Sequence, residues 1–119
     1  MLSAWERKGP KRWPRGQRFA LTDTGTSAEA DYRTAVAESR ASGRAVLEGA
    51  LAAWAEPKGV APKDGVVLGE LRSGRSAMTE LVRELEPAGF APDDVRAAIE
   101  RLVAAALLAP LPLPSETAR

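Results

Sequence analysis

Residues 92–108 read PDDVRAAIERLVAAALL, and this stretch decides how the rest of the chain is interpreted. Proline is favoured at the first position of a helix, and the helix dipole favours acidic residues such as Asp93 and Asp94 in the first turn. Apolar residues then recur at the three- and four-residue spacing of a helix with one buried face: Val95, Ile99, Leu102, Val103 and Ala106. The stretch therefore predicts an amphipathic helix that begins at Pro92 and ends near Leu108.

Two further apolar segments precede this helix. Ser76 is a favoured N-cap residue for a second helix, which the Pro-Ala-Gly sequence at 87–89 would end. Its inward face would hold Met78, Leu81, Val82 and Leu85. Phe90 in the following turn is expected to fill the space between the two crossing helices. Residues 66–71 predict a short apolar helix or strand upstream of both.

Residues 65–111 of the 119 resemble the helical core of a winged helix-turn-helix domain. The string at 94–103 (DVRAAIERLV), followed by Leu107 and Leu108, is similar to the recognition helix and strand entry of many such regulators. A Gly-Arg-Ser turn at 74–76 is also similar to the turn before the second helix in peptide-binding winged helices of the PqqD type. The resemblance implies a mainly α fold and a binding module used in transcription regulation.

The resemblance does not extend to the wing. A wing should follow the third helix, but residues 110–114 (PLPLP) predict an extended segment that is at best an edge strand. A string similar to the second wing strand and its exit turn occurs instead at residues 18–25 (RFALTDTG). We therefore expect a permuted domain, or one in which strands are exchanged in a homodimer. Finding Phe19 and Leu21 exposed and unpaired would contradict this hypothesis.

Residues between the wing-like strand and the core keep helical spacing. Thr26 and Glu29 match a capping box, so the pattern predicts one long amphipathic helix over residues 27–55. Gly43 weakens a helix by about 1 kcal/mol relative to Ala, so two helices with a break near Ser42 and Gly43 are the alternative. Residues 56–64 are a linker by composition.

Together these segments predict a mainly α, winged-helix-like chain that forms one compact domain. Its parts would be a basic arm (1–18), a short strand with the long helix (19–55), the linker (56–64), and the helical core with its proline-rich tail (65–119).

The composition excludes several kinds of chemistry. The chain has no cysteine and no histidine, so zinc sites, disulfides, thiolate nucleophiles and histidine general bases are all ruled out. Its 16 Asp and Glu residues form no recognisable metal or catalytic constellation. We therefore expect a protein that is not an enzyme, with no catalytic residue, no metal and no cofactor.

Charge is distributed unevenly along the chain. The first 18 residues carry six basic side chains against Glu6 alone, whereas the remainder is acidic and the whole chain has a net charge of +1. Basic side chains neutralise phosphates and aromatic rings stack on bases, so a nucleic-acid-binding arm is expected to use Arg7, Lys8, Lys11, Arg12, Trp13, Arg15 and Arg18. The alternative for the same residues is a solvated tail whose tryptophans fold back onto the core.

The third helix is a weaker candidate for reading DNA. Asp93, Asp94 and Glu100 outnumber Arg96 and Arg101, and carboxylates at the helix N-terminus would repel phosphates. An acidic surface of this kind favours a protein partner, which Arg96 and Arg101 could contact. The competing hypothesis is therefore a protein–protein interaction adaptor that uses the acidic core or the long helix.

No apolar run approaches the roughly 20 residues that span a bilayer, and no apolar segment follows the basic start as in a signal peptide. A cytoplasmic protein without a membrane partner is therefore expected. Abundant Ala, Arg and Gly are typical of a GC-rich, bacterial source.

Overall fold

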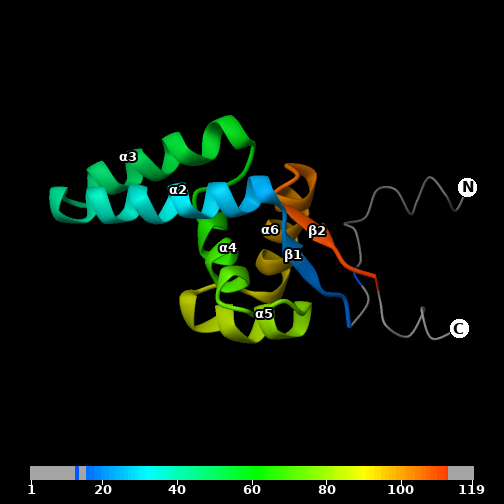
Figure 1. Cartoon of the computed structure of the whole chain (residues 1–119). Helices are drawn as coiled ribbons and strands as arrows, with labels where there is room; N and C mark the ends of the chain where they lie inside the picture. Colours follow the sequence, from blue (N-terminus) through cyan, green and yellow to red (C-terminus); the bar gives the residue numbers. More distant parts are fainter. Residues whose placement is uncertain (1–12, 14–15, 113–119) are drawn as a thin grey trace, which may run out of the picture.

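The computed structural model describes Trp13 and residues 16–112, and this part of the chain is mainly helical (Figure 1). Its helices are α2 (Asp23–Ser39), α3 (Arg44–Ala55), α4 (Asp64–Arg72), α5 (Met78–Leu85) and α6 (Pro92–Ala104), and its strands are β1 (Phe19–Leu21) and β2 (Leu108–Pro110). Short 3-10 turns extend α2, α3 and α5 at Arg40–Ser42, Glu56–Lys58 and Glu86–Ala88. The predicted start of α6 at Pro92 is confirmed, although this helix ends at Ala104, before the predicted end near Leu108.

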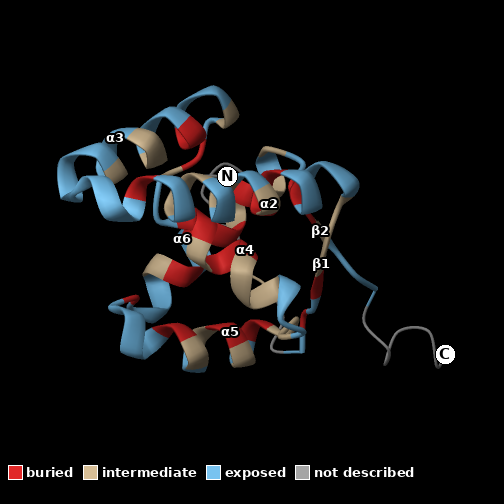
Figure 2. Ribbon diagram, turned by 60° about the vertical axis from the view of Figure 1, so that its left-hand side comes forward, coloured by how far each residue is buried: buried red, intermediate tan, exposed pale blue. Residues whose placement is uncertain are grey.

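The core lies among α4, α5 and α6, where the buried residues gather in Figure 2. The large apolar side chains of these three helices that are fully enclosed are Val67, Leu68, Leu81, Leu85, Val95, Ile99 and Leu102. Burial of one such side chain contributes about 1.5–3 kcal/mol, so these positions hold the three helices together. Phe90 is buried in the turn between α5 and α6, as the sequence predicts.

The two strands come from opposite ends of the described chain. β1 pairs antiparallel with β2, so that Phe19 faces Pro110 and Leu21 faces Leu108. Next to β1, Arg18 forms an antiparallel bridge with Ala77, which immediately precedes α5. Phe19 is 1% exposed. The condition that would contradict the permuted arrangement is therefore not met, and β1 completes the sheet within its own chain.

The single long helix predicted over residues 27–55 is wrong, because α2 and α3 form an antiparallel hairpin (Figure 1). The chain turns at Gly43, whose φ of +105° is a conformation that L side chains rarely adopt. The alternative of a break near Ser42 and Gly43 is therefore confirmed. The apolar stripe continues through the turn because the apolar faces of the two helices pack on each other. The Tyr32 and Trp54 rings, for example, meet edge-on with their centroids 5.1 Å apart.

The start of α2 also differs from the prediction. Its N-cap is Thr22, whose hydroxyl accepts a hydrogen bond of 2.9 Å from the Gly25 amide, so the capping box at Thr26 is wrong. The Thr22 hydroxyl also donates to the Ala106 carbonyl at 2.6 Å. A Cβ on Gly25 would overlap the Leu107 carbonyl oxygen. These contacts join the first turn of α2 to the segment that links α6 with β2.

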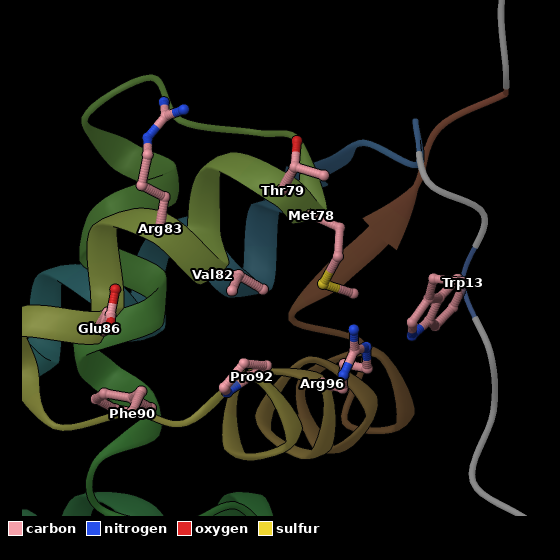
Figure 3. A pocket seen from close by; sticks show the side chains of 9 residues that line it. All are labelled: Trp13, Met78, Thr79, Val82, Arg83, Glu86, Phe90, Pro92 and Arg96. Atoms are coloured by element: carbon pink, nitrogen blue, oxygen red, sulfur yellow. The ribbon is translucent and has the colours of Figure 1, made fainter.

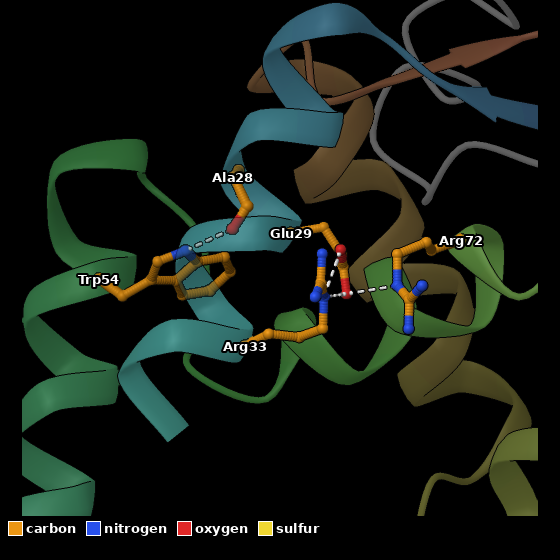
Figure 4. Close-up of polar contacts among 5 residues, drawn as sticks. All are labelled: Ala28, Glu29, Arg33, Trp54 and Arg72. Atoms are coloured by element: carbon orange, nitrogen blue, oxygen red, sulfur yellow. Dashed lines mark hydrogen bonds and ion pairs between the residues drawn. The ribbon is translucent and has the colours of Figure 1, made fainter. Parts of the chain in front are cut away.

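A buried carboxylate attaches the hairpin to the three-helix core (Figure 4). Glu29, expected to cap a helix, is 2% exposed and accepts hydrogen bonds from Arg33 at 2.9 and 3.0 Å and from Arg72 of α4 at 3.1 Å. Beside it, the Trp54 indole donates to the Ala28 carbonyl at 2.9 Å. Both partners of the Glu29 carboxylate are charged, as a buried charge requires.

Candidate nucleic-acid interface

The candidate interface lies beside α5 and α6, where Trp13 contacts residues 16–112, which we call the folded body. Trp13 packs edge-on against the buried Phe19 ring, with a centroid separation of 5.1 Å and an interplanar angle of 85°. Figure 3 shows its indole close to Arg96 of α6 and Met78 of α5. The alternative interpretation, in which a tryptophan folds back onto the core, is therefore confirmed for Trp13.

Backbone contacts fix this junction on both sides. The Phe19 amide donates to the Ser76 carbonyl at 2.9 Å, and the Met78 amide donates to the Gln17 carbonyl at 2.9 Å. The buried Gln17 side chain donates to the Leu111 carbonyl at 2.8 Å. Residues 17–19 are therefore a structural part of the domain, and a basic arm would have to precede them.

Ser76 does not cap α5 as predicted. The N-cap residue is Ala77, and the backbone amides of Ser76 and Ala77 donate to the Glu80 carboxylate at 3.1 and 3.2 Å. These hydrogen bonds, first from Ala77 and then from Ser76, lower the pKa of Glu80. The Ser76 hydroxyl instead accepts a hydrogen bond of 3.1 Å from Arg18.

A hollow of about 600 Å³ lies between Trp13, the length of α5 and the N-terminal half of α6 (Figure 3). Met78, Val82 and Phe90 give it an apolar wall, while Arg83 and Arg96 stand at its edge. Arg83 and Arg96 are both substantially exposed. The hollow thus combines apolar surface with two accessible guanidinium groups.

Neighbouring carboxylates reduce the positive charge that these arginines offer. Arg96 donates to Asp93 at 3.0 Å, and Arg83 lies 3.8 Å from Glu84. Asp94 accepts a hydrogen bond of 3.0 Å from the Ala91 amide and so caps the N-terminus of α6. The described residues carry eleven Lys and Arg against fourteen Asp and Glu. The folded body is therefore net acidic.

The two arginines expected to contact a partner have different surroundings. Arg96 is exposed at the edge of the hollow, whereas Arg101 donates two hydrogen bonds of 2.8 Å to the buried Asp64. This pairing raises the pKa of Arg101. No sequence signal pointed to it, because the two residues are 37 positions apart. We assign Arg101 to the packing of α6 against α4.

Of the proposed arm, the described residues include Trp13 and Arg18, whereas Arg7, Lys8, Lys11, Arg12 and Arg15 lie outside them. Within residues 16–112, no helix combines the length and apolar character needed to cross a bilayer. The same part of the chain contains no group of three or more acidic side chains placed to hold a metal ion. Comparisons with protein-family models, with curated proteins and with solved structures gave no match.

Proposed function

We propose that this chain is a non-enzymatic, nucleic-acid-associated regulatory protein that holds the phosphate backbone with its basic N-terminal arm. One observation carries the proposal: the chain enters the folded body at Trp13, beside the exposed Arg96 in the first half of α6. Five basic residues that precede Gly16 flank Trp13 in the sequence and lie outside the described part. In helix-turn-helix proteins, the two helices that would correspond to α5 and α6 face the DNA.

The topology supports a permuted winged helix as the scaffold. Three helices, α4 to α6, pack around one core, and β2 follows α6 where a wing would begin. β1 takes the place of the returning wing strand, because it pairs with β2 and bridges to Ala77 before α5. In this arrangement the start of β1 and the end of β2 lie side by side, where a wing loop would otherwise join the strands.

The distribution of charge supports phosphate binding by the arm and not by the folded body. The body is net acidic and Arg96 is paired with Asp93, so the body would add little to phosphate binding. The arm holds a net positive charge within a short segment, and this is the property that backbone binding requires. Affinity would therefore depend strongly on salt and weakly on sequence.

A matched pair of charge variants tests the proposal. Lys11→Gln with Arg12→Gln removes two positive charges from the arm, and Arg40→Gln with Lys63→Gln removes two from exposed positions elsewhere. Each lost phosphate contact should make the slope of log K against log salt less negative by about 0.9 on duplex DNA. The arm variant should therefore lose nearly two units of slope, whereas the control should keep the slope of the unmodified chain. Equal slopes in all three proteins would contradict the proposal.

The hollow between α5 and α6 favours a second candidate function, that of a protein-interaction adaptor. An apolar wall with arginines at its edge could receive an apolar side chain together with a nearby carboxylate. This function needs no nucleic acid. Arg96→Ala and Val82→Ala would then weaken binding of the protein partner, whereas the arm variant would bind it normally.

A further inference from the structure

The hollow beside Trp13 has the size and the lining of a site for a small molecule. Its volume of about 600 Å³ lies within the range of roughly 300–1,000 Å³ that is usual for ligand pockets. Met78 and Phe90 are buried, and Val82 packs against the same core. The volume therefore suits a whole small molecule, whereas a single side chain of a docked protein would fill only part of it.

The apolar lining favours a flat, aromatic ligand. Figure 3 shows the Met78 side chain at the Trp13 end of the hollow and the Phe90 ring at the opposite end. A thioether adapts its shape to its neighbour and makes favourable contacts with aromatic rings. Aromatic side chains also attract other rings beyond the effect of buried area alone. A body of about two rings would contact all of these groups.

The charge at the Trp13 end of the hollow fits one carboxylate. The Arg96 side chain is 47% exposed, and its hydrogen bond to Asp93 uses Nη1. A guanidinium carries five N–H donors, and Asp93 is 97% exposed. Arg96 can therefore receive a carboxylate from a ligand without disturbing any buried contact.

The acidic side chains around the hollow limit the total negative charge of a ligand. Glu86 lines the hollow at the end away from Arg96 (Figure 3). Asp93 is next to Arg96, and Glu84 lies 3.8 Å from Arg83 at the edge. These carboxylates would repel a molecule that carries several phosphates, such as a nucleotide. A single negative charge placed at Arg96 is the arrangement that meets the least repulsion.

We propose that this hollow binds a small aromatic monocarboxylate, with the carboxylate on Arg96 and the rings against Met78, Val82 and Phe90. Thr79, Arg83 and Arg96 are exposed, so the ligand can enter along this edge without any opening of the core. The proposal goes beyond both proposed functions, because neither of them requires a small ligand. It also does not depend on nucleic-acid binding.

Two probes of the same shape test the proposal on the full chain without nucleic acid. 1-Naphthaleneacetate has two rings and one carboxylate, and 1-naphthaleneacetamide is its neutral counterpart. Isothermal titration calorimetry should give the acid a dissociation constant on the order of 0.1–1 mM. The amide should bind about fivefold more weakly, since an exposed charge pair contributes at most about that factor. The methyl NMR signal of Met78, one of two methionines, should shift and saturate with the same constant.

Three variants separate the charge from the apolar lining. Arg96→Gln should weaken the acid about fivefold and leave the amide unchanged. Arg40→Gln makes the same charge change at an exposed position after α2 and should leave both affinities unchanged. Thr79→Phe adds a ring to the lining from an exposed position and should weaken both probes at least about tenfold.

Circular dichroism should show the same helix content in all three variants, because the substituted side chains are exposed. Equal affinity for the acid and the amide in the unmodified chain would overturn the proposal. So would a preference for the acid that Arg96→Gln leaves intact. If neither probe shifts the Met78 methyl signal at about 10 mM, the proposal is overturned and the hollow is left to a protein partner.

Discussion

Arg101 of α6 donates two hydrogen bonds of 2.8 Å to the carboxylate of Asp64 at the start of α4, and the Asp64 side chain is fully buried. The same carboxylate accepts a hydrogen bond of 2.9 Å from the Ala61 amide. One ion pair thus joins the helix that follows the hairpin to the last helix of the core. Losing one member of such a pair leaves the other charge without compensation.

Arg101→Met should therefore lower the free energy of unfolding by about 3 kcal/mol, since Asp64 would keep only the Ala61 amide. Asp64→Asn retains an acceptor oxygen and should cost less, about 1–2 kcal/mol. Arg96→Met is the control, because the Arg96–Asp93 pair is exposed and such pairs contribute at most about 1 kcal/mol. Urea unfolding measures all three. A loss for Arg101→Met no larger than that for Arg96→Met would show that the buried pair does not hold α4 to α6.

Two glycine substitutions should change stability in opposite directions. Gly25→Ala places a methyl group against the Leu107 carbonyl and should cost about 1–3 kcal/mol, because backbone must move to accommodate it. Gly69→Ala, inside α4 with nothing within 4 Å of the added carbon, should add about 0.5–1 kcal/mol through helix propensity. Thermal unfolding distinguishes them. If both variants were stabilised, the contact between α2 and the end of α6 would be looser than described.

Acid should weaken the junction before α5 through Glu80. Backbone hydrogen bonds lower the pKa of Glu80 below its ordinary value of 4.5 in the folded chain, so its ionised form stabilises the fold at neutral pH. This contribution is lost as pH falls from about 4.5 through the lowered folded-state pKa. Glu80→Gln should reduce the drop in unfolding free energy between about pH 6 and about pH 3.5. Glu84→Gln, on the same helix, serves as the control, and equal drops in both variants would contradict this role.

The helical core was predictable because its signals are local. Pro92, the acidic first turn and the spacing of the apolar residues specify α6, and glycine and proline end α5 before Phe90. The hairpin was not predictable in the same way. Its two helices share one apolar stripe in the sequence, and the 3-10 turn at Arg40–Ser42 and the positive φ of Gly43 separate them.

The polar anchors were missed for a different reason. Glu29 and Thr26 match a capping box, yet α2 begins earlier, because Thr22 and Gly25 contact residues 106 and 107 at the far end of the chain. Glu29 is then buried and paired with Arg72, 43 residues away. Tertiary contacts of this kind override local motifs. In the sequence, this buried ion pair was indicated only by the four-residue spacing between Glu29 and Arg33.

The most direct test of the account compares DNA binding by the full chain with binding by a chain lacking residues 1–12. This truncation keeps Trp13, Gln17 and Arg18, which belong to the folded body. Fluorescence anisotropy would follow labelled duplex and single-stranded DNA at low and high salt. We predict salt-sensitive binding by the full chain that is largely lost on truncation. No binding by the full chain at low salt, or equal binding by both chains, would contradict a nucleic-acid-binding arm.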